Sequence, residues 1–243
     1  MSDNLRQSWA RLGVAFDERF PRKGAIDLER LIVETCIEGR RDSRLLFGMR
    51  GWLLKHHDLI NASRLIRMAK DSKATAVLGA ICDSVLDHAP RSSLRYVRGH
   101  CKPIRQPEYV FEEVVRSRAL QKINEEENLP VWKRWGLISR EMESMEDAIA
   151  EKSFVLRHNR NLAFRALFGT GVRAEILSYL VEHGEANAHQ IALGIGQSYE
   201  PVYSELKFCA SVGLLASVVR GRARVYHVAP NLFRHALKPL LAA

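Results

Sequence analysis

The amino-acid sequence predicts a mainly α-helical protein in which an N-terminal helical bundle precedes three further helices and a small β-hairpin. Three observations predict this class. Apolar residues recur at helical spacing through most of the 243-residue chain. The chain contains only 15 glycines and 8 prolines, the residues that most often interrupt helices. Near the C-terminus, two β-branched stretches flank an arginine-rich turn, as in a hairpin. The length allows two domains of ordinary size.

Residues 1–88 are expected to form an N-terminal helical domain. Apolar stripes predict five short helices, separated by turns of a few residues, over 4–20, 26–37, 43–53, 59–69 and 74–86. We expect Asp58 to cap the fourth helix, and Asp71 or Ser72 the fifth. Short turns hold successive helices antiparallel, so a compact bundle is favoured over a stack of helical repeats, for which no repeat period is found.

Residues 89–107 are expected to form a basic linker. The stretch contains three prolines with arginines and lysines between them, and its apolar residues keep no helical period. A charged surface loop is the simpler interpretation and a phosphate-contacting arm is the alternative, so no site is assigned to it. Residues 108–168 are expected to form connecting helices over 109–126, 131–150 and 154–168, with Trp132 and Trp135 in the core or an interface.

Residues 169–243 have the most consistent pattern of the chain. Helices are expected over 172–181, 188–193 and 199–212, with Ser198 as the N-cap of the third. Strands over 214–219 and 225–228 would form a hairpin whose tip is Arg220-Gly221-Arg222-Ala223-Arg224. The inward stripes predict one shared core made of Ile176, Leu180, Ile191, Val202, Leu206 and Leu214. A last helix over 231–241 would pack on a second subunit or on the bundle.

We interpret this C-terminal domain as a winged helix-turn-helix. The segments RAEILSYL, HQIALGIGQS, VYSELKFCASVGLL and GRARVYHV follow one another in an order that resembles bacterial transcriptional regulators of the ArsR/MarR type. The segment FGTGVRAEIL is also similar to winged-helix domains found beside bacterial nucleotidyltransferase-type toxin genes. The first resemblance covers the last third of the chain, and it implies double-stranded DNA as the partner and a homodimer as the assembly.

The predicted DNA contacts lie on the outward face of the 199–212 helix, at its start, and on the hairpin. They are Gln197, Ser198, Tyr199, Tyr203, Ser204, Lys207, Arg220, Arg222 and Arg224. Glutamine can pair with adenine and lysine with guanine or phosphate, while the hairpin arginines would follow the backbone or the minor groove. The helix carries two glutamates and one lysine, fewer cations than many DNA-reading helices carry.

Composition and motifs exclude several other classes. No cofactor, phosphate-loop, hydrolase or metal-binding signature occurs, so we expect no catalytic residue, no metal site and no cofactor. The four cysteines are scattered and no apolar leader opens the chain, which predicts a reduced, cytoplasmic protein without a membrane span. The formal net charge is +9, and residues 153–243 hold 10 basic against 5 acidic residues, which favours a polyanionic partner.

Two functions therefore follow from the sequence. The first is a bacterial, sequence-specific DNA-binding transcriptional regulator, whose N-terminal helices dimerise, sense a signal or bind a partner. The alternative is a protein-interaction module, such as an antitoxin-like partner or scaffold, whose winged helix contacts protein. A positive face on the recognition helix and hairpin would favour the first function, and an apolar face there the second.

Overall fold

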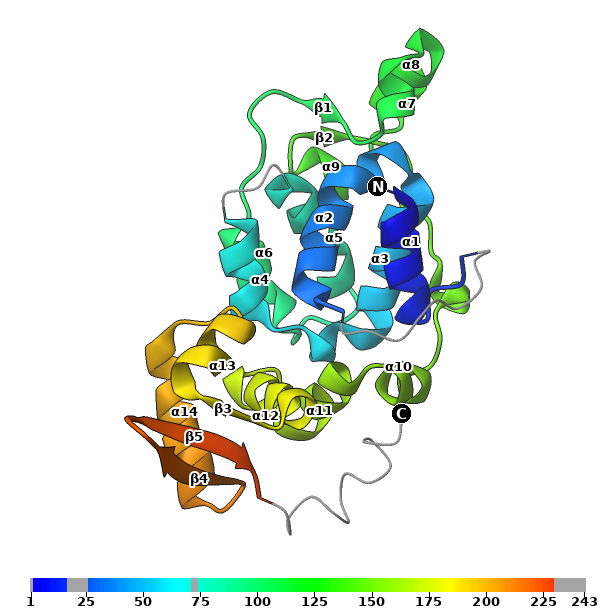
Figure 1. The fold of residues 1–243 in the computed structure, drawn as a ribbon. Coiled ribbons are helices and arrows are strands. Elements are labelled where there is room, and N and C mark those ends of the chain that lie inside the picture. The colour runs from blue at the N-terminus through cyan, green and yellow to red at the C-terminus, as the bar shows by residue number, and fades with distance from the viewer. Residues whose placement is uncertain (1, 17–25, 71–73, 230–243) are drawn as a thin grey trace. The chain divides into compact units, whose positions relative to one another are not determined.

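The computed structural model describes residues 2–16, 26–70 and 74–229 (Figure 1). Within these residues the chain forms fourteen α-helices and five short strands, which confirms the mainly helical class. The chain divides into two compact units, Met1–Val155 and Leu156–Ala243. The predicted helix over 231–241 lies outside the described residues, as do Asp71 and Ser72.

The first unit begins with α1 (Ser2–Arg11), α2 (Leu28–Glu38), α3 (Ser43–His56), α4 (Ala62–Ala69) and α5 (Thr75–Leu86). The last four are close to the helices expected, but the helix expected over 4–20 is wrong in its end, because α1 stops at Arg11, before Gly13 with φ +86°. Helices α1, α2, α3 and α5 lie side by side around a buried core (Figure 1). The N-cap of α4 is Asn61, whose side chain accepts from the Arg64 amide at 3.0 Å, so the prediction of Asp58 as this cap is wrong.

The segment expected to be a linker is folded into the first unit. Residues 94–100 form α6 (Leu94–His100), and the Leu94 and Val97 side chains are fully buried. The boundary between the two units falls instead between Val155 and Leu156. The apolar residues of α6 are too few to show a period against the surrounding arginines, which is why composition alone suggested a linker.

Residues 108–155 differ most from the expectation. The helix predicted over 131–150 is wrong, because α9 (Pro130–Lys133) ends before Gly136, whose φ of +71° cannot continue a helix. Beyond this glycine, β2 (Leu137–Ile138) pairs in parallel with β1 (Glu108–Tyr109). The helix predicted over 109–126 is divided into α7 (Glu112–Val115) and α8 (Arg118–Glu126), and Ser117 caps the second. Helix α10 (Lys152–His158) spans the unit boundary.

The second unit contains α11 (Arg160–Phe168), α12 (Val172–His183), α13 (Ala188–Gly194) and α14 (Tyr199–Ser211). The last three lie at the expected positions, whereas the helix expected over 154–168 is divided at Asn159 into α10 and α11. Asn187 and Gln190 form a reciprocal capping box that starts α13. Five of the six predicted core residues are buried in one cluster, and the sixth, Leu214, is partly buried against it.

A three-stranded antiparallel sheet completes the second unit. The hairpin consists of β4 (Leu215–Arg220) and β5 (Ala223–Val228), joined by a two-residue turn in which Gly221 has φ +64°. Residues 185–187, which separate two of the expected helices, form β3 (Glu185–Asn187), and this strand pairs with β5. The strand order is therefore β3-β5-β4. Buried Tyr226 of β5 belongs to the same core cluster as Val202 and Leu206 of α14.

Candidate nucleic-acid interface

Helix α14 has one buried side and one exposed side. Val202, Leu206 and Cys209 are buried, and the opposite side presents four exposed polar residues, Glu200, Ser204, Lys207 and Ser211. Because these four recur at spacings of three and four, they line one face of the helix. Two of the predicted contacts, Ser204 and Lys207, therefore lie together on this face.

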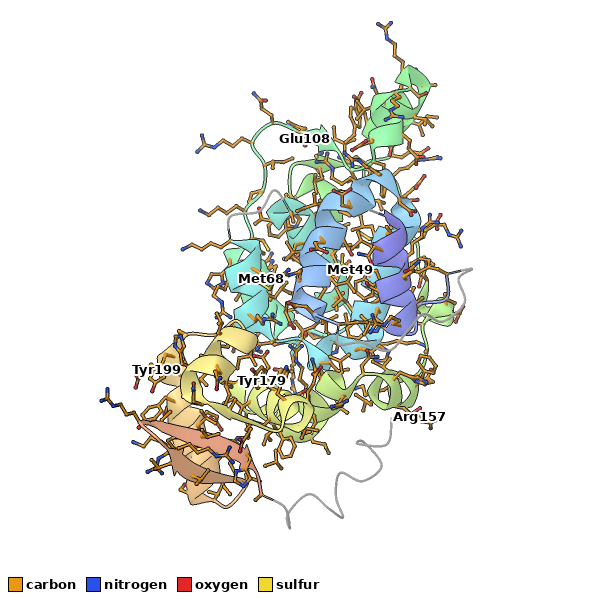
Figure 2. The ribbon with its side chains drawn as sticks, in the orientation of Figure 1. Met49, Met68, Glu108, Arg157, Tyr179 and Tyr199 are labelled. Carbon is orange, nitrogen blue, oxygen red and sulfur yellow. The ribbon has the colours of Figure 1, made fainter. Side chains whose placement is uncertain are left out.

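Three tyrosines and two cations gather beside the start of α14. Tyr199 lies in its first turn (Figure 2), and its ring stacks on that of Tyr203 with centroids 5.5 Å apart. The Lys207 ammonium is 5.5 Å from the centre of the Tyr203 ring. Burial raises the pKa of Tyr226, as do the neighbouring Tyr203 and Tyr199, while nearby Arg224 opposes the shift. We call Tyr199, Tyr203, Lys207, Arg224 and Tyr226 the tyrosine cluster.

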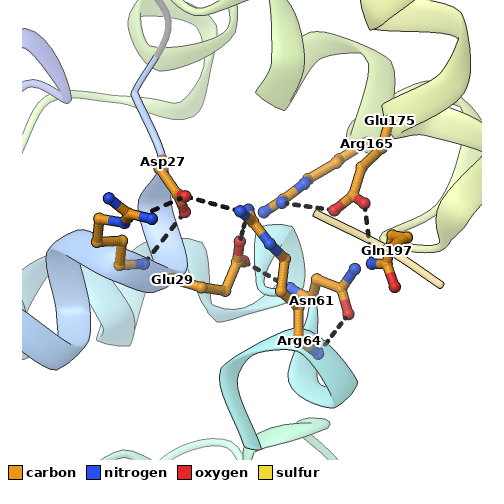
Figure 3. A network of polar contacts seen from close by, with 8 residues as sticks. Asp27, Glu29, Asn61, Arg64, Arg165, Glu175 and Gln197 are labelled. Carbon is orange, nitrogen blue, oxygen red and sulfur yellow. Dashed lines mark hydrogen bonds and ion pairs between the residues drawn. The ribbon is translucent and has the colours of Figure 1, made fainter. Parts of the chain in front are cut away.

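Gln197 is used inside the second unit. Its side-chain nitrogen donates to Glu175 at 3.2 Å, and the other oxygen of Glu175 accepts from Arg165 at 3.2 Å (Figure 3). The side chains of Arg165 and Glu175 are almost fully buried. This chain of contacts joins α11 and α12 to the loop before α14, so Gln197 holds the loop in place. Ser198 is the N-cap of α14, as predicted, and is exposed, but its side chain makes no capping bond.

The three hairpin arginines do not form one row. Arg220 is paired with Ala223 and Arg224 with Val219, so the pleat directs Arg220 and Arg224 to opposite faces of the hairpin. Arg220 forms an ion pair of 2.6 Å with Glu185 of β3, and Arg224 donates to the Ser217 hydroxyl at 3.3 Å. Arg222 is exposed at the turn. Arg224 thus shares a sheet face with Tyr226 of the tyrosine cluster, and Arg220 lies on the other face.

The other flank of α14 is more apolar. Arg173 of α12 donates to Glu205 at 2.6 Å, and its guanidinium carbon lies 4.7 Å from the centre of the Phe208 ring. Phe208 and Val212 are about half exposed, at 46% and 50%. Sequence reasoning did not single out Phe208 or Tyr226. The alternation of β5 is the signal that places Tyr226 on the same sheet face as Arg224.

In the described parts of the chain, no group of three histidine, cysteine or acidic side chains is arranged to hold a metal ion, and no helix is long and apolar enough to cross a membrane. Burial raises the pKa of Cys101 to about 12 and that of Cys209 to about 11, so both thiols stay protonated near neutral pH. Comparisons with protein-family models, curated protein sequences and solved structures find no match for this chain.

Proposed function

We propose that the protein is a double-stranded-DNA-binding transcriptional regulator whose second unit acts as a winged helix-turn-helix. In this proposal α14 is the recognition helix and the β4–β5 hairpin is the wing. The order of α12, α13, α14 and the hairpin around one apolar core supports it, since this is how such domains present a helix to the major groove. The resemblance to ArsR/MarR-type regulators points the same way.

The tyrosine cluster is the observation that carries the proposal. It places aromatic rings, hydroxyl groups and two exposed cations on α14 and β5, the elements that would form the recognition helix and the wing, and its buried member Tyr226 belongs to the same core as α14. Tyrosine hydroxyls, lysine and arginine all contact phosphate, and serine and lysine can also reach base edges. Ser204 and Lys207 are the residues expected to read bases, while Tyr199, Arg222 and Arg224 are expected to contact the backbone.

The test is a DNA-binding titration across a salt series. Binding sites are first selected from a randomised duplex library and from DNA upstream of the gene. Arg222→Ala should weaken binding to every duplex by a similar factor and lower the slope of log affinity against log salt by about 0.9 if Arg222 binds one phosphate. Arg118→Ala, at an exposed position of α8, is the matched control. An unchanged slope for both Arg222→Ala and Arg224→Ala would contradict the proposed wing.

Base reading is tested by discrimination among selected and scrambled sites. Ser204→Ala and Lys207→Ala should each reduce discrimination by roughly 1–3 kcal/mol where the side chain meets a base edge, with little change in non-specific affinity. Gln197→Ala should act differently, because its amide is held by Glu175 and its removal would loosen the loop before α14. Its effect should therefore appear in affinity for all sites.

A protein-interaction module remains the second candidate, and the apolar side chains of this unit favour it. Phe208 on α14, Val212 directly after it, and Val218 and Val219 on β4 are all more than two-fifths exposed. Arg220 is also already paired with Glu185. If wild type binds no duplex at low salt, while Phe208→Ser or Val219→Ser abolishes capture of one defined protein partner, this second function replaces the first. The homodimer is a further part of the proposal, tested by sedimentation at micromolar concentration.

A further inference from the structure

A buried carboxylate in the first unit holds two arginines at one place. Asp83 of α5 is only 5% exposed, and its oxygens accept from Arg98 Nε, Arg134 Nη1 and Trp135 Nε1, each at 2.8 Å. Arg98 comes from α6 and Arg134 directly follows α9, so the carboxylate brings together two segments that are far apart in the sequence. The indole bond also fixes Asp83 from the core side.

The two guanidinium groups are ordered and still accessible. Their side chains are 45% and 56% exposed, and each gives one nitrogen to Asp83, which leaves other N–H groups free of any bond within the described residues. One negative charge cannot neutralise two positive ones, so the pair keeps a net positive charge. Guanidinium groups already held in one geometry lose less conformational entropy on binding, and their planar donors suit phosphate oxygens.

More cations lie next to this pair. The Ile104 amide donates to the Trp135 carbonyl at 3.1 Å, which holds the segment after α6 against residues 134–136. A Cβ at Gly136 would be 2.3 Å from the Ile104 carbonyl oxygen, so only glycine allows this close approach. Lys102 and Arg105 of that segment are exposed, as is Lys133.

The stretch between Asp87 and β1, which includes α6, contains no acidic residue that could offset these cations. Residues 88–107 contain five lysines and arginines and no acidic residue. Figure 2 shows blue-tipped side chains extending into solvent between α6 and β1. We call Arg98, Lys102, Arg105, Lys133 and Arg134 the Asp83 surface.

We propose that the Asp83 surface binds the phosphate backbone of double-stranded DNA without reading its sequence. The choice of DNA as the polyanion rests on the proposed function, and the surface adds a second, non-specific contact to that of the second unit. Arg98 and Arg134 supply an ordered pair of phosphate donors, and Lys102, Arg105 and Lys133 extend the positive field along the backbone. Asp83 acts as a positioning residue, since it touches the arginines and not the DNA.

The first test removes charge without touching the Asp83 hydrogen bonds. Lys102→Gln/Arg105→Gln is compared with Arg118→Gln/Lys122→Gln, which removes the same charge from exposed positions of α8. On a non-specific duplex, the first pair should lower the salt slope by about 0.9 for each phosphate that is no longer bound, and weaken binding on the order of tenfold per phosphate at 0.1 M salt. The α8 pair should change the slope little, and the ratio of specific to non-specific affinity should stay the same for both.

The second test distinguishes the effect of the ordered geometry of Arg98 and Arg134 from the effect of their charge. Asp83→Asn makes the protein more positive, so charge alone predicts tighter DNA binding, whereas disruption of the ordered arginine pair predicts weaker binding. We expect weaker binding while the helical fold is retained, and circular dichroism checks the fold, since tryptophan fluorescence would respond directly to the lost Trp135 hydrogen bond. Should Asp83→Asn not fold, Arg98→Lys/Arg134→Lys keeps the charge and removes the planar donors, and it should weaken binding as well.

The outcomes distinguish this inference from the proposed function. If Lys102→Gln/Arg105→Gln and Arg118→Gln/Lys122→Gln weaken binding equally, the proposed role of the Asp83 surface is overturned, while the proposal for the recognition helix and wing is not affected. Weaker binding by the 102/105 pair, with no effect of the Lys207, Arg222 and Arg224 variants, would support the Asp83 surface and overturn the winged-helix interface. Tighter binding by Asp83→Asn would overturn the positioning role.

Discussion

The two units bury their polar groups in different ways. All four tryptophans belong to the first unit, and each indole N–H donates to a different acceptor: the Thr35 hydroxyl, the Leu12 and Glu141 carbonyls and the Asp83 carboxylate. The core of the second unit is built mainly from aliphatic residues on α12, α13 and α14. Both units have an apolar core, and the first unit adds buried indole hydrogen bonds to acceptors on other elements.

Buried charge follows the same division. In the first unit, Glu29 is fully buried and accepts from the Asn61 amide and from Arg64, whose other nitrogen binds Asp27 (Figure 3). These bonds join α2 to the start of α4, more than 30 residues away. In the second unit, the Arg165–Glu175 pair spans only ten residues. Both pairs are buried, so removing one partner should be costly in either unit, but only in the first unit would it break a contact between elements more than 30 residues apart.

The largest effect should come from the apolar core of the second unit. Leu206→Ala removes a fully buried side chain of α14 and should lower the free energy of unfolding by about 2–5 kcal/mol. Urea unfolding followed by circular dichroism measures it. Leu193→Ala, at a side chain that is 78% exposed, should change stability little. Equal losses in the free energy of unfolding for the two substitutions would show that this core does not stabilise the second unit.

In the first unit, the corresponding test of core packing is at Gly79, which lies against the Trp135 ring. An added Cβ at Gly79 would be 2.4 Å from the Trp135 ring, so Gly79→Ala should cost about 1–3 kcal/mol through overpacking. Tryptophan fluorescence follows it, because all four tryptophans are in this unit. Gly99→Ala is the control, since an added Cβ meets nothing within 4 Å there. If Gly79→Ala leaves the free energy of unfolding unchanged, α5 packs only loosely against Trp135.

Two helices of the second unit differ in their N-terminal capping bonds, and smaller changes in the free energy of unfolding are expected there. Asn187 caps α13 with a reciprocal capping box, whereas the side chain of Ser198 makes no capping bond to α14. Asn187→Ala should therefore lower the free energy of unfolding by about 1 kcal/mol, and Ser198→Ala by clearly less. The denaturation midpoints of the two variants decide this, and the reverse order would contradict the assigned caps.

The pH dependence of the first unit should also give a small effect, limited to that of one proton. Burial lowers the pKa of His56 below its ordinary 6.5, so the unfolded chain takes up this proton at a higher pH than the folded chain. Stability should then fall as the pH is lowered through about 6.5, by at most about 1.4 kcal/mol per pH unit for one proton. His56→Gln should remove this part of the slope in unfolding measured between pH 7.5 and 5.5. A slope that is identical in the variant would exclude His56 as its source.

The candidate interface was predictable in part. The period of α14 located Ser204 and Lys207 on its outward face, because the buried residues of that helix recur on the other side. Periodicity could not show that Gln197 binds Glu175 or that Arg220 binds Glu185, because each partner comes from another element. The strand at 185–187 was missed for the same reason, since its hydrogen bonds go to β5, about 40 residues later.

The apolar and turn residues of the second unit recur at short, regular spacings, so they predict α12, α13 and α14, the hairpin and the shared core. That residues 89–107 belong to the first unit, that Gly136 ends a helix, and that Asp83 binds Arg98, Arg134 and Trp135 follows from contacts in three dimensions. Such contacts join residues that are far apart along the chain. Asp83 and Trp135 are 52 residues apart, and a hydrogen bond over that separation leaves no period in the sequence.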